Sequence, residues 1–158
     1  MKIGTWTIIV FLVAAIIAVY AYQYYVSASS STEPMPDKGI YIVRNGKLES
    51  INITKIPPSN GTVLIALLSS TCPHCHAFWP TLYKVARELE NKISVYFVIL
   101  DPALSEPMRD IALYFYNNNL WDGSVPAIIV YRNGSYVATW IGRMDETELL
   151  NKINEVIS

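Results

Sequence analysis

The N-terminal stretch is the feature that most restricts how this 158-residue chain can fold. No charged residue occurs from Ile3 to Thr32, and Ile8 to Tyr22 is an unbroken run of apolar and aromatic residues. With its flanking residues, this run reaches the roughly 20 residues that a helix needs to cross about 30 Å of hydrocarbon. Trp6 lies at one edge and four tyrosines crowd the other, as in the aromatic belts found at membrane interfaces. We therefore expect residues 1–26 to form a transmembrane signal anchor that contacts the lipid bilayer through residues 5–26.

The charges around this stretch predict its orientation. Lys2 and the N-terminal amine are the only positive charges nearby, and positive charges tend to remain on the cytoplasmic side. This predicts a single-pass protein of the cell membrane whose remaining residues are extracytoplasmic. The alternative is a cleaved signal peptide, for which Val26-Ser27-Ala28 offers an imperfect small-residue cleavage site. Both interpretations export the rest of the chain.

Net charge and cysteine content narrow the possible functions. The formal net charge is -1, so the chain lacks the basic footprint that a nucleic-acid partner would require. There are 2 cysteines, Cys72 and Cys75, separated by two residues. A disulfide scaffold needs bridges between distant segments, so this pair does not staple the fold. It is available for redox chemistry or for a metal.

The exported part divides into a linker and one domain. Residues 27–38 are small, polar and interrupted by prolines, which predicts a flexible linker before a domain at 39–158. Asn45-Gly46 and Asn133-Gly134 suit the tight turns of two hairpins. Asp145 is expected to cap the last helix. Strands are expected at 40–43, 48–53, 63–68, 93–100, 127–132 and 135–141, and helices at 73–91, 105–117 and from 145 onward.

This element order predicts an α/β fold. A strand, a helix and a second strand over 63–100 form a unit with two parallel strands, and the hairpins add antiparallel ones. The result is a mixed central sheet flanked by helices. Apolar residues repeat at helical spacing in each predicted helix and mark the side expected to face the sheet. These residues are Phe78, Leu82, Val85 and Leu89 in the first helix, Ile111, Tyr114 and Phe115 in the second, and Leu149, Ile153 and Val156 in the third.

The cysteines lie where a buried strand ends and a helix begins. This places Cys72 at the helix N-terminus, where unpaired N–H groups and the helix dipole favour a thiolate. The thiolate is the species that attacks a disulfide. Pro73 suits the first helical turn because it has no N–H to satisfy. Cys75 falls on the buried side of the helix, so an exposed attacking sulfur has a sheltered partner one turn later.

From about Thr62 to the C-terminus, the chain resembles the thioredoxin superfamily. The resemblance rests on Val63–Leu68 leading into Cys72-Pro73-His74-Cys75, on Pro80 five residues later, on Val125-Pro126, and on Gly142 after the second hairpin. It implies a thioredoxin fold and a thiol–disulfide oxidoreductase with no cofactor. Cys72 and Cys75 would be its catalytic residues and would form its redox-active disulfide.

The resemblance also implies partners and a substrate site. Protein thiols and disulfides would be the substrates, and a membrane redox partner would recycle the pair. A cis bond at Val125-Pro126 would bring the Val125 backbone against Cys72. With Gly142 beside it, this segment would bind a substrate strand.

Some residues bear on the direction of electron flow. Pro73-His74 is the dipeptide of DsbA-type oxidases, in which the histidine helps to stabilise the thiolate and makes the disulfide a better oxidant. Three positions depart from thioredoxin itself. Ala66 replaces a buried carboxylate, Phe97 its lysine neighbour, and Thr71 a tryptophan. Cys75 must therefore lose its proton to water or to another group, which weakens the case for thioredoxin-like reduction.

Other interpretations stay open. Cys72-Pro-His-Cys75-His76 satisfies the c-type haem attachment pattern, with Met108 or Met144 as a second axial ligand, although the strand–helix order is atypical of such proteins. Copper or zinc could bind the cysteines and histidines, but four ligands on one helical turn do not form a tetrahedral site without strain. Within the redox interpretation, the compact domain resembles anchored reductases that serve cytochrome c maturation. We favour disulfide formation or isomerisation in exported proteins.

Overall fold

The computed structural model describes residues 5–28, 33–53 and 60–158, and along its first helix it describes side chains only at positions 10 and 12–22. The chain forms two separate compact units, residues 1–33 and 34–158. The first contains helix α1 (Thr5–Ala28). In the part of the chain that the structure describes, no helix combines the length and the hydropathy needed to cross a membrane. The transmembrane helix expected at residues 5–26 is therefore not shown by the structure.

Helix α1 also extends beyond the anchor predicted from the sequence. Ser27 and Ala28, which we expected in the linker, are helical. No glycine or proline occurs between Tyr22 and Ala28, so nothing in that segment interrupts the helix.

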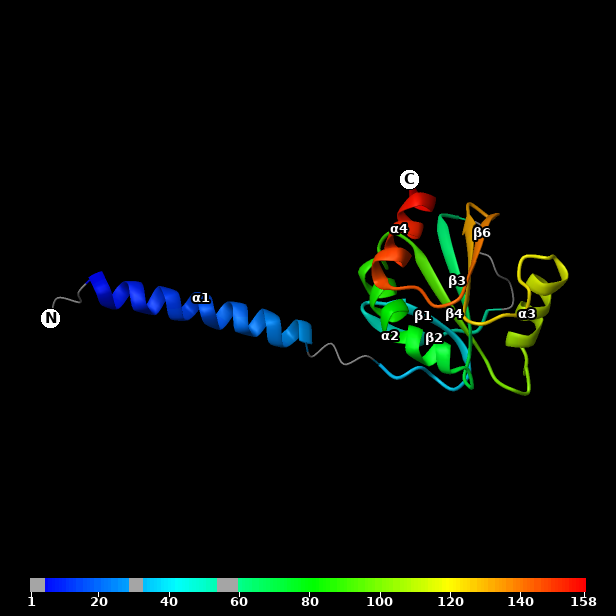
Figure 1. Ribbon diagram of the computed structural model, residues 1–158, viewed down its shortest axis with the longest axis horizontal. Coiled ribbons are helices and arrows are strands. Elements are labelled where there is room, and N and C mark those ends of the chain that lie inside the picture. The colour runs from blue at the N-terminus through cyan, green and yellow to red at the C-terminus, as the bar shows by residue number, and fades with distance from the viewer. Residues whose placement is uncertain (1–4, 29–32, 54–59) are drawn as a thin grey trace. The chain divides into compact units, whose positions relative to one another are not determined.

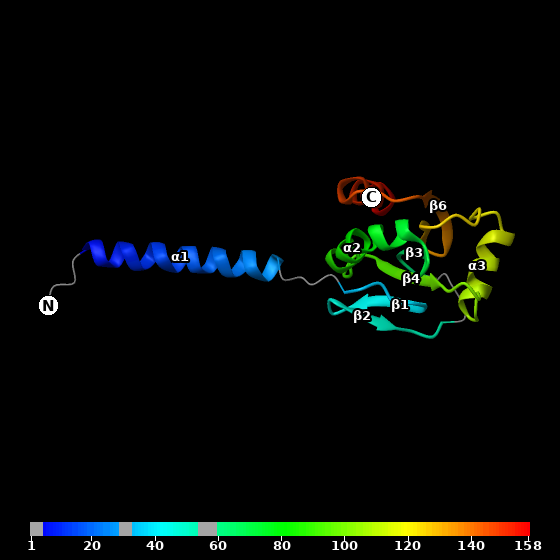
Figure 2. The ribbon, with the colours of Figure 1, turned by 60° about the horizontal axis from the view of Figure 1, so that its bottom comes forward.

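The second unit is built on a sheet of six strands in the order β2-β1-β4-β3-β5-β6. Neighbouring strands β3 and β4 are parallel, and every other pair of neighbours is antiparallel. This is the mixed sheet predicted from the sequence. The hairpin β1–β2 lies at one edge of the sheet (Figure 2). The strands are β1 (Gly39–Arg44), β2 (Lys47–Ser50), β3 (Thr62–Ser69), β4 (Ser94–Leu100), β5 (Ala127–Arg132) and β6 (Ser135–Ile141).

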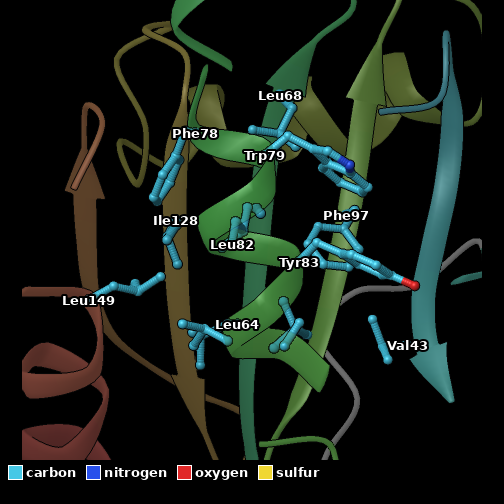
Figure 3. Packing of buried hydrophobic residues seen from close by; sticks show 14 of the residues in the cluster. Val43, Leu64, Leu68, Phe78, Trp79, Leu82, Tyr83, Phe97, Ile128 and Leu149 are labelled. Carbon is cyan, nitrogen blue, oxygen red and sulfur yellow. The ribbon is translucent and has the colours of Figure 1, made fainter. Parts of the chain in front are cut away.

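Helices cover both faces of this sheet (Figure 1). Helices α2 (Pro73–Glu88) and α4 (Glu146–Ile157) pack on one face, and α3 (Met108–Asn117) packs on the other. In Figure 3, Phe78 and Leu82 of α2 and Leu149 of α4 point toward Ile128 of the sheet. Because both faces are covered, the six inner residues of β3 are all buried, which explains its continuous apolar sequence.

Several boundaries differ from the predicted ones for local reasons. Helix α3 begins at Met108 rather than Ser105, because Pro107 is its N-cap and the Ser105 N–H and hydroxyl donate to the Asp101 carboxylate outside the helix. Tyr114, which we placed on the buried side of α3, is 45% exposed, and Ala112 is buried instead. The remaining shifts are small: α2 ends at Glu88 rather than near 91, β2 ends at Ser50 rather than 53, and Val156 is only partly buried.

The predicted cap of the last helix is confirmed. Asp145 precedes α4, and its carboxylate accepts a hydrogen bond of 2.8 Å from the N–H of Glu148. This bond satisfies one of the four N–H groups that a helix leaves unpaired at its start. The cap ends the loop that begins at Gly142, next to the site described below.

Candidate active site

Cys72 is the N-cap residue of α2. Its backbone is extended, and its Sγ accepts a hydrogen bond of 3.2 Å from the Cys75 N–H. Pro73 occupies the first helical position, where its missing N–H costs nothing. The Cys72 side chain is partly exposed. A sulfur in this position receives a backbone donor and the positive end of the helix dipole while staying open to another molecule.

Cys75 lies one turn later and faces the core, as predicted. Its side chain is 0% exposed, and it belongs to the cluster formed by α2, α4 and the sheet. Burial raises the pKa of the Cys75 thiol to about 12, and its hydrogen bond with the Cys72 side chain adds to this shift. A backbone hydrogen bond at Ser69 acts in the opposite direction but does not outweigh burial. Cys75 is therefore a protonated thiol over the physiological pH range.

In the described part of the chain, no carboxylate is buried with Cys75 to take its proton. Ala66 of β3 and Phe97 of β4 pair directly across the parallel strands, and both are fully buried in the same cluster as Cys75. Among the residues that the structure describes, no Asp, Glu, Lys or Arg is buried. The two replacements singled out in the sequence thus lie side by side in the apolar cluster that also contains Cys75.

The segment before β5 approaches the cysteines from the other side. The Val125-Pro126 peptide bond is cis, as the resemblance led us to expect. The Cys72 thiol donates to the Val125 carbonyl oxygen, with the two atoms 3.7 Å apart. The Gly142 N–H donates to the Pro126 carbonyl oxygen at 2.9 Å, and Gly142 has a φ of +97°, which glycine adopts without strain. Residues far apart in the sequence, Cys72, Val125, Pro126 and Gly142, are thereby brought together.

The two histidines of the motif have different environments. His74 is exposed on the first turn of α2. Its expected stabilisation of the Cys72 thiolate stays a prediction. The His76 Nε2–H donates to the Ser70 carbonyl oxygen at 2.7 Å, so the nitrogen that would ligate a haem iron is engaged within the chain. Met108 and Met144 lie on opposite faces of the sheet, in different hydrophobic clusters. Over the described residues, no group of three or more His, Cys, Asp or Glu side chains is arranged to hold a metal.

Sequence patterns did not reveal one part of the site. The turn Ser69–Thr71 before Cys72 and its bond to His76 depend on how the chain folds back at the end of β3. No spacing rule connects a serine carbonyl with a histidine six residues later. The only indication in the sequence was the run of three small polar residues between a buried strand and the first cysteine.

Together, these features define a class of protein. A mixed sheet flanked by helices, a cysteine pair at the start of the helix after β3, and a cis proline beside it make up a thioredoxin-fold domain with a dithiol site. A comparison with protein-family models agrees, since the thioredoxin model matches residues 44–155. The chain belongs to the thioredoxin family, whose members act on protein thiols and disulfides.

Individual relatives are distant. A thioredoxin of Haemophilus influenzae is 24% identical over 115 residues, which cover 73% of this chain and 94% of that protein. Among solved structures, a crystal structure of thioredoxin from Aeropyrum pernix superimposes with a TM-score of 0.65 at 23% identity. The match covers 77% of this chain and 96% of that one. At this level of identity, the likeness to the solved structure establishes the fold alone.

Proposed function

We propose that this protein is a thiol–disulfide oxidoreductase that exchanges disulfides with protein substrates through Cys72 and Cys75. The observation that carries the proposal is the contrast between the two sulfurs. Cys72 is partly exposed and accepts the Cys75 N–H, whereas Cys75 is buried. Thiol–disulfide exchange needs one sulfur that an incoming molecule can reach and a second that can close or open the intramolecular disulfide.

The chemistry can be written in the oxidising direction. A substrate thiolate attacks Cys72 Sγ of the Cys72–Cys75 disulfide, which forms a mixed disulfide and releases Cys75 as a thiolate that takes up a proton. A second substrate thiolate then attacks the substrate sulfur of the mixed disulfide and releases Cys72 as a thiolate. The substrate gains a disulfide, and the protein keeps both electrons as a dithiol. In the reducing direction, the Cys72 thiolate attacks a substrate disulfide and Cys75 resolves the intermediate.

The buried Cys75 favours oxidation or isomerisation at the mixed-disulfide stage, whereas its high pKa makes it a slower leaving group when a substrate thiolate first attacks the disulfide. At the mixed-disulfide stage, Cys75 can attack Cys72 and expel the substrate before the second substrate thiol reacts. Because the pKa of Cys75 is raised to about 12, few molecules carry its thiolate, and the mixed disulfide persists. A longer-lived intermediate gives a second substrate thiol more time to complete the transfer. The Pro73-His74 dipeptide, which resembles that of DsbA-type oxidases, also favours the oxidising direction.

Reduction of exported thiols, as in cytochrome c maturation, is the second candidate. The compact domain of residues 34–158 favours it, because no large insertion interrupts the fold. The reduction potential separates the two. Equilibration with glutathione buffers should give a value near about −120 mV for an oxidase and about −270 mV for a reductase.

Trapping experiments test the roles of the cysteines. A Cys75→Ser variant is expected to accumulate mixed disulfides with substrates or with the redox partner, because the resolving sulfur is missing. A Cys72→Ser variant is expected to accumulate none, because its remaining sulfur is buried. Non-reducing electrophoresis of the two variants makes the comparison. Equal trapping by both would contradict the assigned roles.

We also propose that the domain works outside the cytoplasm, tethered to the cell membrane and recycled by a membrane redox partner. The support is the sequence of α1, which contains 24 residues with no charge and carries its nearest positive charge on the N-terminal side. Alkaline carbonate extraction of membranes tests the anchor, and protease treatment of intact cells tests the location. Release of the protein into the carbonate supernatant would argue against the anchor.

A further inference from the structure

The segment that delivers Cys72 to the site, called here the Ser69–Thr71 turn, consists of Ser69, the last residue of β3, and the turn residues Ser70 and Thr71. Ser69 and Ser70 are partly exposed and Thr71 is exposed, so none of the three side chains anchors the turn in the core. A segment without a buried anchor is positioned by its hydrogen bonds instead. The position of Cys72 therefore depends on the bonds that this turn makes.

Backbone bonds hold the two ends of the turn. The Ser70 N–H donates to the Leu100 carbonyl oxygen at the end of β4, at 3.1 Å, and the Cys72 N–H donates to the Ser69 carbonyl oxygen, also at 3.1 Å. The backbone of Ser69 is in addition hydrogen-bonded to Cys75. The same turn thus contacts both cysteines of the pair.

A side chain of α2 holds the middle of the turn. His76 Nε2 lies 2.7 Å from the Ser70 carbonyl oxygen, and because a carbonyl oxygen only accepts, Nε2 must carry the hydrogen. The backbone of His76 is also tied to the site, since its N–H donates to the Cys72 carbonyl oxygen at 3.2 Å. Among the described residues, the side chain of Ser69 bonds only within the turn: its Oγ pairs with Thr71 Oγ1 at 3.2 Å and accepts the Thr71 N–H at 3.4 Å. The His76 side chain therefore connects the turn to α2.

We infer that His76 is a positioning residue for the cysteine pair: its imidazole locks the Ser69–Thr71 turn onto the first turns of α2 and so fixes the two sulfurs for exchange. This inference rests on the proposed thiol–disulfide exchange. It gives the histidine after the second cysteine a role distinct from that of a haem ligand. For this role, the side chain at position 76 needs only a neutral hydrogen-bond donor that reaches the Ser70 carbonyl oxygen.

A pair of substitutions separates the hydrogen bond from the size of the side chain. His76→Gln keeps a donor on a flexible side chain, and His76→Met has a similar length and no donor. The full-length protein in detergent is oxidised to the Cys72–Cys75 disulfide, and its exchange with a dithiol peptide is followed under single-turnover conditions. We expect His76→Met to exchange roughly fivefold more slowly, the factor that corresponds to one net hydrogen bond, and His76→Gln to recover most of that loss. Ala77→Met, at an exposed neighbouring position of α2, should exchange like the parent protein.

Two further readouts distinguish positioning from general destabilisation. In His76→Met, amide hydrogen exchange should accelerate at Ser70 and Cys72 while the protected amides of β3 keep their rates. The equilibrium constant of the cysteine pair with glutathione should shift in His76→Met and return in His76→Gln. Equal exchange rates for the Met, Gln and parent proteins would overturn the inference, as would a Gln variant as slow as the Met variant. A parent protein that exchanges with no dithiol would instead remove the proposed function itself.

Discussion

The raised pKa of Cys75 predicts how the resolving step depends on pH. Consider a mixed disulfide between Cys72 and a small aromatic thiol, from which Cys75 expels the thiol in a single turnover. Burial is the largest cause of the pKa shift, and we expect it to remain the largest when Cys72 is in a mixed disulfide. The reacting species is the Cys75 thiolate, so the rate follows the fraction of Cys75 that is ionised.

The expected magnitude follows from the shift of the Cys75 pKa from 9.0 to about 12. At neutral pH, roughly one Cys75 in 10⁵ is ionised, against about one in 100 for an unshifted thiol. A more basic thiolate is also a better nucleophile, which recovers about 20-fold of this thousandfold loss, so the net rate is roughly 50-fold lower than for an unshifted thiol. The rate should also rise about tenfold with each pH unit and show no plateau below about pH 11, whereas an unshifted thiol would level off above about pH 9.

Stopped-flow absorbance of the released aromatic thiolate measures this rate directly. The Cys75→Ser variant provides the control, because it can form the mixed disulfide but cannot resolve it internally. A rate that levels off between about pH 9 and pH 10 would refute the reasoning, since Cys75 would then ionise like an unburied thiol.

Three further predictions concern the stability of the domain. In the reduced protein, the raised pKa of Cys75 contributes stability that is fully present below about pH 9 and lost as the pH rises toward about 12. The urea midpoint of the parent protein should therefore fall over that pH range, and that of Cys75→Ala should fall less. Asp145→Ala removes the cap of α4 and should cost about 1 kcal/mol of unfolding free energy, whereas Asp145→Asn should retain most of it. Leu149→Ala empties a fully buried position between α4 and the sheet and should cost about 2–5 kcal/mol, measured as a lower urea midpoint with an unchanged slope.

Much of the domain could be predicted because its local signals and its packing agree. The hairpin over 127–141 matched its predicted bounds, since strands rich in β-branched and aromatic residues flank an Asn-Gly turn whose residues adopt positive φ. The buried strand β3 was recognisable because both of its faces are covered, so its apolar run has no interruption. Errors arose where a side chain overrode the local pattern, as at Asp101, which captures Ser105 and delays the start of α3.

The site was predictable to the extent that its residues form motifs. The two cysteines and Pro73 lie on one turn, and the resemblance identified Val125, Pro126 and Gly142 as their neighbours across the fold. The bond between His76 and Ser70 could not be predicted in this way, because it depends on the path of a turn whose residues have no strong conformational preference. The burial of Cys75 could be predicted from helical spacing, but the size of its pKa shift required knowing how completely the folded cluster, which includes Ala66 and Phe97, removes Cys75 from water.

The chain has no cysteine outside the reactive pair, and its interior is held together by aliphatic and aromatic side chains. No covalent cross-link between distant segments has to survive for this architecture to persist. The same scaffold can therefore tolerate a strongly reducing or a strongly oxidising medium. Of its cysteines, the pair at the N-terminus of α2 changes its oxidation state with that medium.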